Sequence, residues 1–278
     1  MIPAISILLP TRKRKEALER SLKTLFDRAD NPRRIELLLG FDDDDQDTLQ
    51  YFLDNIAPYL DLKDVVYTVV KFKRLGYQRL NEYLNELYKH STGRWVFFYN
   101  DDAAMETPSW DSICMAHDNE FTLIRTETTN GHPYAIFPII PRKWVELVGH
   151  ISLHQLNDAW VSQIAWMLDI VTTVPVMVTH ERFDLTGENN DSTFIERQIF
   201  EGNPKDPRDF NYKTMRNARM HEAHTIATYL ESQGKVLTHW HDAIAGKIKS
   251  FVRDHYRHSG HNVQHPGNLT YPCIVELM

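Results

Sequence analysis

Short apolar runs alternate with stretches of helical spacing over the first hundred residues of the chain. The run at 5–9 is typical of a buried strand, whereas residues 14–28 place apolar side chains at helical intervals along one face. This alternation predicts an α/β fold with a mostly parallel central sheet, flanked by helices and joined by right-handed crossovers. We expect strands over 5–9, 35–40, 65–72 and 94–99, and helices over 14–28, 47–59 and 77–90.

The pattern changes after residue 102 and becomes richer in helices toward the C-terminus. The last segment, 259–278, carries two glycines and two prolines and is typical of an irregular tail. We therefore divide the chain near residue 200, into a sheet-bearing core over 1–200 and a helical extension over 201–278. The elements expected after residue 102 are strands over 121–125, 134–140 and 174–178, and helices over 142–148, 156–168, 208–233 and 239–256.

Two adjacent carboxylates, Asp101 and Asp102, follow the apolar run 95–99. A strand buried on both faces is expected there, and ligands of open α/β sheets bind at the carboxyl ends of the strands. Neighbouring carboxylates repel each other unless a cation lies between them. A divalent metal ion that also binds a diphosphate would supply that charge, because hard cations prefer oxygen ligands. The simpler alternative is an acidic loop tip in water.

The composition is that of an ordinary globular protein, with 278 residues, 42% hydrophobic and 25% charged. No apolar run approaches the ~20 residues of a membrane span, and no basic leader precedes the first apolar run. Cys114 and Cys273 are too few for a disulfide framework or a cysteine metal site. These features predict a soluble, cytoplasmic protein without a transmembrane segment.

The charge is unevenly distributed along the chain. The net charge is −7, yet lysine and arginine outnumber aspartate and glutamate between residues 205 and 258. One interpretation is a surface for an anionic acceptor, with Arg216 and Arg219 exposed on it. The other is a solvated helical face without a partner.

Five segments with polar or glycine-containing motifs follow one another on the predicted elements: residues 5–12, 40–43, 75–81, 91–102 and 156–160. In this order they resemble the motifs of GT-A glycosyltransferases, in particular the family 2-like nucleotide-sugar transferases. The resemblance spans roughly residues 5–180, and it departs from the DxD-type motif in having Asn100 before Asp101 and Asp102. It implies a soluble, metal-dependent enzyme that moves a hexosyl or pentosyl group from a nucleotide sugar, a UDP-sugar, to an acceptor hydroxyl.

The resemblance also implies roles for single residues on the donor side. A Mn²⁺ or Mg²⁺ ion would be held by Asp102, with Asp101 on the ribose or the metal and His180 as a further ligand. Such an ion acts as a Lewis acid and stabilises the leaving diphosphate; otherwise His180 is an ordinary surface or core histidine. Asp42 would bind the base or ribose, or else be a turn aspartate. The implied nucleotide-sugar-binding residues are Pro10, Thr11, Arg12, Asp42, Gly76, Arg79, Asn100, Asp101 and Trp160.

On the acceptor side, the resemblance makes Asp158 the candidate general base of an inverting transfer. The alternative is that Asp158 caps the helix over 156–168. Trp160 would stack on a sugar ring or simply belong to the core.

Other functions remain open at this point. A sugar-phosphate nucleotidyltransferase is disfavoured, because the turn after the first strand, Pro10 to Arg14, is basic but lacks the glycines of that class. A non-catalytic nucleotide-sugar-binding protein is a further alternative. Among acceptors, glycans, lipid-linked groups and protein hydroxyls compete with a hydroxymethylated DNA base, as in phage-type DNA glycosyltransferases, which would be flipped into the site. The pI of about 6.0 argues against nucleic acid.

Overall fold

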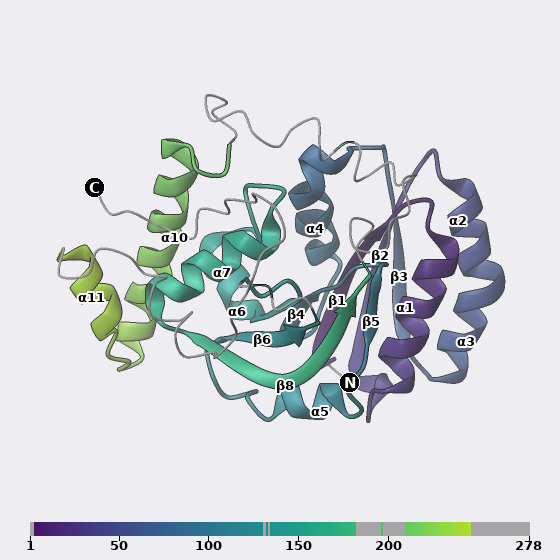
Figure 1. Cartoon of the computed structure of the whole chain (residues 1–278), viewed down its shortest axis with the longest axis horizontal. Coiled ribbons are helices and arrows are strands. Elements are labelled where there is room, and N and C mark those ends of the chain that lie inside the picture. The colour runs from purple at the N-terminus through teal and green to yellow at the C-terminus, as the bar shows by residue number, and fades with distance from the viewer. Residues whose placement is uncertain (1–2, 130–131, 133, 182–195, 197–208, 246–278) are drawn as a thin grey trace.

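The computed structural model describes residues 3–129, 132, 134–181, 196 and 209–245. Its strands are β1 (Ile5–Thr11), β2 (Ile35–Asp42), β3 (Val66–Phe72), β4 (Trp95–Phe98), β5 (Ala103–Met105), β6 (Leu123–Thr128), β7 (Pro138–Pro141) and β8 (Val171–His180). They form one sheet in the order β3-β2-β1-β4-β7-β6-β8-β5. Four of the seven strand pairings among the described residues are parallel. The sheet is therefore mixed, and it curls along β8 (Figure 1), which confirms the predicted α/β class.

Helices cover both faces of this sheet. Side chains of β1 alternate between two hydrophobic clusters, with Ile7 and Leu9 on one face and Leu8 on the other. This burial of both faces explains the unbroken apolar runs of the parallel strands. One face carries α1 (Lys15–Asp27), α2 (Gln46–Tyr51), α3 (Ala57–Leu62) and α5 (Trp110–Met115), and the other carries α4 (Leu80–Lys89), α6 (Arg142–Val148), α7 (Asn157–Leu168), α10 (Lys213–Ser232) and α11 (Thr238–Ile244).

The helix expected over 47–59 runs without a break from Gln46 to Leu62. Its middle turn, Phe52–Ile56, is a wide π turn between α2 and α3. Pro58 lies in the first turn of α3, where its missing N–H would otherwise interrupt the α-helical hydrogen bonds. The wide turn lets the helix continue through the proline.

The second half of the sheet departs most from the sequence pattern. The strand expected over 134–140 is confined to Pro138–Pro141, and β5 and α5 were not expected. Conversely, β8 extends over ten residues, with Pro175 near its middle. The pairing of β8 with β6 shifts register around this proline, because a proline cannot donate to a ladder.

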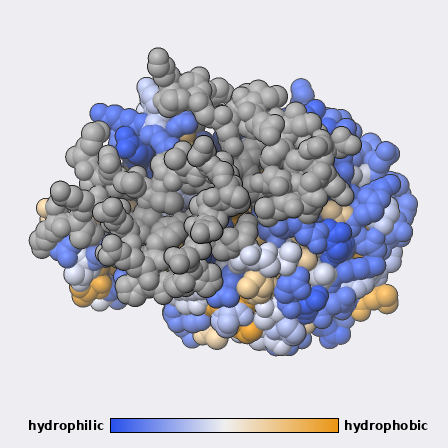
Figure 2. Space-filling model, in the orientation of Figure 1, coloured by the Kyte–Doolittle hydropathy of each residue, from blue (hydrophilic) through white to orange (hydrophobic). Residues whose placement is uncertain are grey.

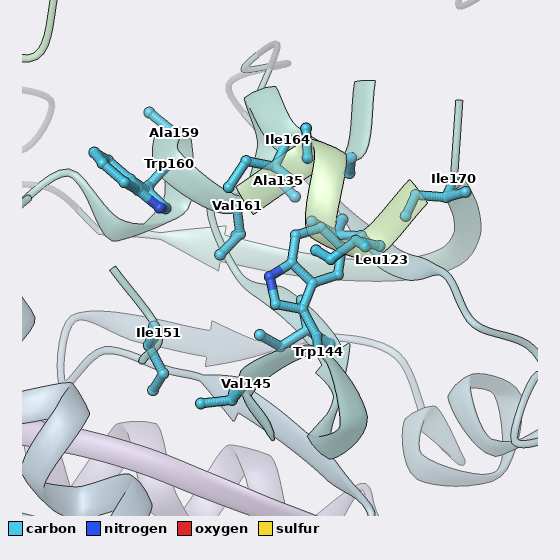
Figure 3. Packing of buried hydrophobic residues seen from close by; sticks show 14 of the residues in the cluster. Leu123, Ala135, Trp144, Val145, Ile151, Ala159, Trp160, Val161, Ile164 and Ile170 are labelled. Atoms are coloured by element: carbon cyan, nitrogen blue, oxygen red, sulfur yellow. The ribbon is translucent and has the colours of Figure 1, made fainter. Parts of the chain in front are cut away.

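The C-terminal helices belong to the main core. Residues of α10 and α11 share one hydrophobic cluster with α4, α6 and α7, and Figure 3 shows part of this cluster around Trp144 and Trp160. The expected boundary near residue 200 falls outside the described residues, as do the end of the helix expected over 239–256 and the tail over 259–278. The division into two parts therefore stays a prediction.

The outer helices are amphipathic. The surface over α1, α2 and α3 is mainly hydrophilic in Figure 2, as expected for helices that bury one face. Within the described part of the chain, no helix has both the length and the apolar character needed to cross a membrane.

Candidate functional site

The carboxyl ends of β1, β2 and β4 meet at a cavity of about 260 Å³. The turn before α4, the first turn of α7 and the end of β8 complete its lining. Arg79 and Trp160, which were predicted to bind the donor, are not part of this lining. The predicted site residues that do line it are Pro10, Thr11, Arg12, Asp42, Gly76, Asn100, Asp101, Asp102, Asp158 and His180.

The centre of the cavity is an acidic pair at the end of β4. Because β1 and β4 are parallel neighbours, the turn after β1 lies beside Asp101 and Asp102. The Thr11 hydroxyl donates to Oδ2 of Asp101 at 2.7 Å, and Nη1 of Arg14 donates to its Oδ1 at 2.8 Å. Nη1 of Arg14 also lies 3.4 Å from Oδ2 of Asp102. The hydroxyl of Ser21 on α1 donates to the Asn100 carbonyl at 2.9 Å and holds the backbone of this turn.

His180, the last residue of β8, reaches the same acidic pair. The antiparallel pairing of β5 with β8 sets His180 opposite Ala103, so that its Nε2 lies 3.2 Å from Oδ1 of Asp102. This contact lacks hydrogen-bond geometry, and Oδ1 of Asp102 and Nδ1 of His180 are both buried without a hydrogen-bond partner among the described residues. A buried carboxylate oxygen that lacks a hydrogen bond calls for an explanation, and a bound cation is one.

The two carboxyl groups differ in their electrostatic surroundings. Burial raises the pKa of Asp101 above its usual range; Arg14 opposes this shift, and the Asp102 charge adds to it. Burial would also raise the pKa of Asp102, but His180 and Arg14 outweigh it and hold that pKa below its usual range. Asp102 is therefore the carboxylate that stays charged most readily.

The Asp102–His180 pair fits one divalent cation. Two ligands at right angles on an ion with bonds of about 2.1 Å lie about 3.0 Å apart, close to the 3.2 Å between Oδ1 and Nε2. No group of three or more histidine, cysteine, aspartate or glutamate side chains that could hold a metal occurs in the described ranges. An ion here would take its other ligands from water and from substrate oxygens, which is the usual coordination of Mg²⁺ in phosphate-binding sites.

Asp42 forms the opposite end of the cavity, at the end of β2, and is only 4% exposed. Its Oδ2 accepts a hydrogen bond from Nη1 of Arg12 at 2.9 Å, and its Oδ1 accepts one from the Tyr83 hydroxyl. The Tyr83 oxygen in turn accepts hydrogen bonds from the backbone of Leu75 at 2.9 Å and of Gly76 at 3.4 Å. Burial, with the Asp42 charge, raises the pKa of Tyr83 to about 12, so the hydroxyl remains a donor at neutral pH.

Glycines make room for this arrangement. A Cβ at Gly40 would lie 2.9 Å from the Phe72 ring, and that ring packs against Tyr83 with centroids 4.7 Å apart. Gly76 has a φ of +78°, a conformation that side chains rarely adopt. The backbone N–H that follows it, that of Tyr77, donates to Glu196 at 2.9 Å.

The other aspartates of the acidic run after β2, Asp43, Asp44 and Asp45, bind to neighbouring parts of the protein. Asp45 caps α2 by accepting a hydrogen bond from the Thr48 backbone N–H at 3.4 Å. It also accepts hydrogen bonds from the Thr48 hydroxyl at 2.9 Å and from the Lys13 backbone at 2.6 Å. Asp44 pairs with Arg12, and Asp43 accepts a hydrogen bond from the backbone of Arg74 at 3.2 Å.

Asp158, Trp160 and Arg79, which were all predicted to bind donor or acceptor, lie in different surroundings in the structure. Asp158 lies in the first turn of α7 and lines the cavity, and the N-cap position of this helix belongs to Leu156. Trp160 is fully buried; its Nε1 donates to Oε2 of Glu222 at 2.9 Å, and it lies within the hydrophobic cluster of Figure 3. Arg79 is exposed and pairs with Glu82.

The expectation that Arg219 lies on an exposed basic surface is wrong. Arg219 is 2% exposed, its Nη2 donates to the Phe210 carbonyl at 2.9 Å, and its guanidinium stacks 3.9 Å from the Phe210 ring centroid. Burial lowers the pKa of Arg219 to about 10. Arg216 is only partly exposed. A count of charges along the sequence could not reveal this burial.

Residues that the sequence analysis did not single out also line the cavity. Arg14 and Tyr83 are the most closely engaged of these, through the acidic pair and Asp42 respectively. The sequence alone carried no signal for Arg14, because its contact with the acidic pair depends on β1 and β4 being neighbours in the sheet. Tyr134 also lines the cavity; its oxygen accepts a hydrogen bond from Gln163 at 3.3 Å and its ring stacks on Trp166.

Solved structures with a similar fold are known. The chain is similar to the mannosyltransferase PcManGT from Pyrobaculum calidifontis in complex with GDP-Man and Mn²⁺, with a TM-score of 0.53, 14% identity, and coverage of 89% of this chain and 80% of that one. It is also similar to S. aureus TarS 1-349 in complex with UDP-GlcNAc, with a TM-score of 0.53, 15% identity, and coverage of 81% and 71%. No protein-family model matches the sequence, and no curated protein matches it significantly.

Proposed function

We propose that this chain, whose fold is that of GT-A-like glycosyltransferases, transfers a sugar from a nucleotide-sugar donor to an acceptor hydroxyl with the help of a divalent metal ion. The observation that carries the proposal is the Asp102–His180 ion pair in the same cavity as Asp42. Its carboxylate oxygen Oδ1 has no hydrogen-bond partner among the described residues. Known neighbours of the fold hold nucleotide sugars, and one of them also holds Mn²⁺.

In this proposal the two ends of the cavity divide the donor between them. Asp42, held by Arg12 and Tyr83, binds the nucleoside. Asp102 and His180 hold Mn²⁺ or Mg²⁺, and Asp101 is kept in place by Thr11 and Arg14. The metal, when bound, supplies positive charge for the leaving diphosphate.

Asp158 is proposed to act on the acceptor. Its carboxylate takes the proton of the acceptor hydroxyl while that oxygen forms a bond to the anomeric carbon. The bond between this carbon and the diphosphate oxygen breaks, and the nucleoside diphosphate leaves with the electron pair. This direct displacement inverts the anomeric configuration, so the configuration of the product tests the role of Asp158 as a base.

The donor nucleotide is proposed to be UDP. Two TarS 1-349 complexes, with UDP-GlcNAc and with UDP at a TM-score of 0.50, support this choice, whereas the mannosyltransferase complex with GDP-Man supports a guanine nucleotide. Titration calorimetry with UDP and GDP in the presence of Mn²⁺ separates the two. A GDP affinity above the UDP affinity would contradict the choice of UDP without affecting the proposed reaction.

A screen of nucleotide sugars by thermal shift, with and without Mn²⁺, is the first test of the function. A ligand at 100 times its Kd stabilises the folded protein by about 2.7 kcal/mol, which is readily measured as a higher Tm. Ligands that shift the Tm are then assayed for hydrolysis of the donor, which a purely binding protein would not catalyse.

Asp102→Ala is the matched variant. We expect it to fold like the parent, because Asp102 is a partly exposed residue of the cavity, and to lose the Mn²⁺-dependent part of the nucleotide response. A variant that responds to nucleotide and Mn²⁺ like the parent would rule out the metal site.

A further inference from the structure

Arg14 brings a permanent positive charge to the acidic pair. It extends from the turn between β1 and α1 into the cavity, and its Nη1 lies 2.8 Å from Oδ1 of Asp101 and 3.4 Å from Oδ2 of Asp102. A guanidinium stays charged at all pH values at which the protein is folded. The repulsion between the two carboxylates is therefore partly balanced before any metal ion binds.

The carboxylate oxygens of Asp101 and Asp102 differ in their partners. Asp101 is engaged on both oxygens, by Thr11 and by Arg14. Asp102 meets Arg14 with Oδ2, while its Oδ1 faces His180 and has no hydrogen-bond partner among the described residues. A metal ion held by Oδ1 of Asp102 and Nε2 of His180 thus leaves the Arg14 contacts intact. Two cations can then flank one carboxylate.

We propose that Arg14 is a resident counter-ion that weakens metal binding at Asp102 and carries part of the charge that a bound diphosphate requires. This inference rests on the proposed function, because it takes Asp102 as the metal ligand. The guanidinium and a metal ion on the other oxygen of Asp102 repel each other, because both are positive charges beside the same carboxylate. The Arg14 charge therefore holds the acidic pair in place without metal and lowers the affinity for metal. The same charge lets nucleoside diphosphate bind with part of its full affinity when metal is absent.

Titration calorimetry with MnCl₂ alone measures the first effect. We expect Arg14→Gln to bind Mn²⁺ about tenfold more tightly than the parent, since a positive charge beside the metal is gone. Arg14→Lys keeps the charge and should bind Mn²⁺ like the parent. Arg28→Gln is the matched control: Arg28 follows the 13-residue helix α1 and contacts the Glu106 carbonyl at 3.1 Å, about 20 Å from Arg14 along the helix.

A charge-matched double variant separates charge from geometry. Arg14→Gln combined with Asp101→Asn removes one positive and one negative charge, so the net charge beside Asp102 equals that of the parent. It is expected to fold even if Arg14→Gln alone does not, and to restore the Mn²⁺ affinity of the parent. A double variant that keeps the tighter binding, or a Lys variant that binds as tightly as the Gln variant, would overturn the proposal.

UDP binding in the presence of EDTA measures the second effect. The parent should bind UDP without metal. Arg14→Gln should lose at least about tenfold of that UDP affinity, although its Mn²⁺ affinity rises. If only GDP binds the parent, the same experiment is done with GDP. The two proposals fail differently. A parent that binds no Mn²⁺ refutes the metal site and this inference with it, whereas Mn²⁺ binding that depends on Asp102 but is unchanged or weaker in Arg14→Gln refutes the role of Arg14 alone.

Discussion

Tyr83→Phe removes a single hydroxyl that connects two walls of the cavity. This hydroxyl donates to Asp42 at the end of β2 and accepts hydrogen bonds from the backbone of Leu75 and Gly76, in the turn before α4. The ring itself packs on Phe72, and phenylalanine preserves that packing. The substitution therefore tests the hydrogen bonds without creating a cavity in the core.

The expected loss of stability follows from these bonds. A hydrogen bond to a charged group contributes about 1.5–3 kcal/mol, and one between neutral groups about 1 kcal/mol. Asp42 keeps its Arg12 partner and the Leu75 amide lies near water, so we expect a loss of about 2–4 kcal/mol in the free energy of unfolding. For a chain of this size this corresponds to a fall in Tm of about 5–10 °C.

Binding provides the readout that a purely structural role would not affect. If Tyr83 orients Asp42 for the nucleoside, UDP affinity in the presence of Mn²⁺ should fall about tenfold, equivalent to about 1.4 kcal/mol. Tyr88→Phe, on the same helix and outside the cavity lining, is the control and should retain UDP affinity. A double-mutant cycle with Asp42→Asn should show a coupling of about 1–3 kcal/mol. Additive effects of the two substitutions, or unchanged UDP affinity in Tyr83→Phe, would refute the reasoning.

The same residue predicts a pH dependence. The pKa of Tyr83 is raised to about 12 in the folded protein, above the value of about 10 for an unfolded tyrosine. The unfolded chain therefore loses this proton first, so the stabilisation from Tyr83 is complete below pH 10 and is lost as the pH rises toward 12. Urea titrations of parent and Tyr83→Phe from pH 8 to 11 should show their difference in stability shrinking above pH 10. A constant difference would contradict the raised pKa.

Three further substitutions test the remaining roles. Asp42→Asn should weaken UDP and UDP-sugar equally in calorimetry, and a loss confined to the sugar-bearing ligand would move this residue to the sugar. Asp158→Asn should lower kcat by about 10²–10⁴-fold with little change in donor affinity, and an active variant that gives inverted product would exclude it as the base. Trp160→Phe should cost about 2–4 kcal/mol of stability, because it leaves buried Glu222 without the indole donor. A change confined to the KM for the donor, at unchanged Tm, would instead restore a sugar-stacking role.

The parallel half of the fold could be predicted from the sequence, because each of its segments shows either an apolar strand run or helical spacing. The run 35–40 is apolar except for Glu36, and the observed strand extends it by only two residues, to Asp42. The antiparallel half could not be predicted equally well. β5 has three residues, too few to establish an alternation. The strand expected over 174–178 is shorter than β8, whose ends carry Thr172, Thr173 and Thr179.

The sequence predicted which residues line the cavity better than it predicted which of them contact one another. Strand ends identified Thr11, Asp42 and Asp102 as residues of one sheet edge, and the structure lines one cavity with them. The contacts depend on the order of strands, which a single sequence does not reveal: β1 lies beside β4, and this adjacency brings Arg14 to the acidic pair. The burial of single residues was also not visible in the sequence. The structure chooses the core alternative for Trp160, and it buries Arg219, which was expected on an exposed surface.

The polar groups of the cavity are held in place by protein contacts before a ligand binds. Both oxygens of Asp42 already accept a hydrogen bond each, from Arg12 and Tyr83. A carboxylate has about four acceptor positions, so these bonds fix its orientation and still leave capacity for a ribose hydroxyl or a base N–H. Asp102 differs, because its Oδ1 has no hydrogen bond among the described residues. The prearranged Asp42 and the Asp102 oxygen without a hydrogen bond form the electrostatic pattern expected of a site that a cation and a diphosphate complete.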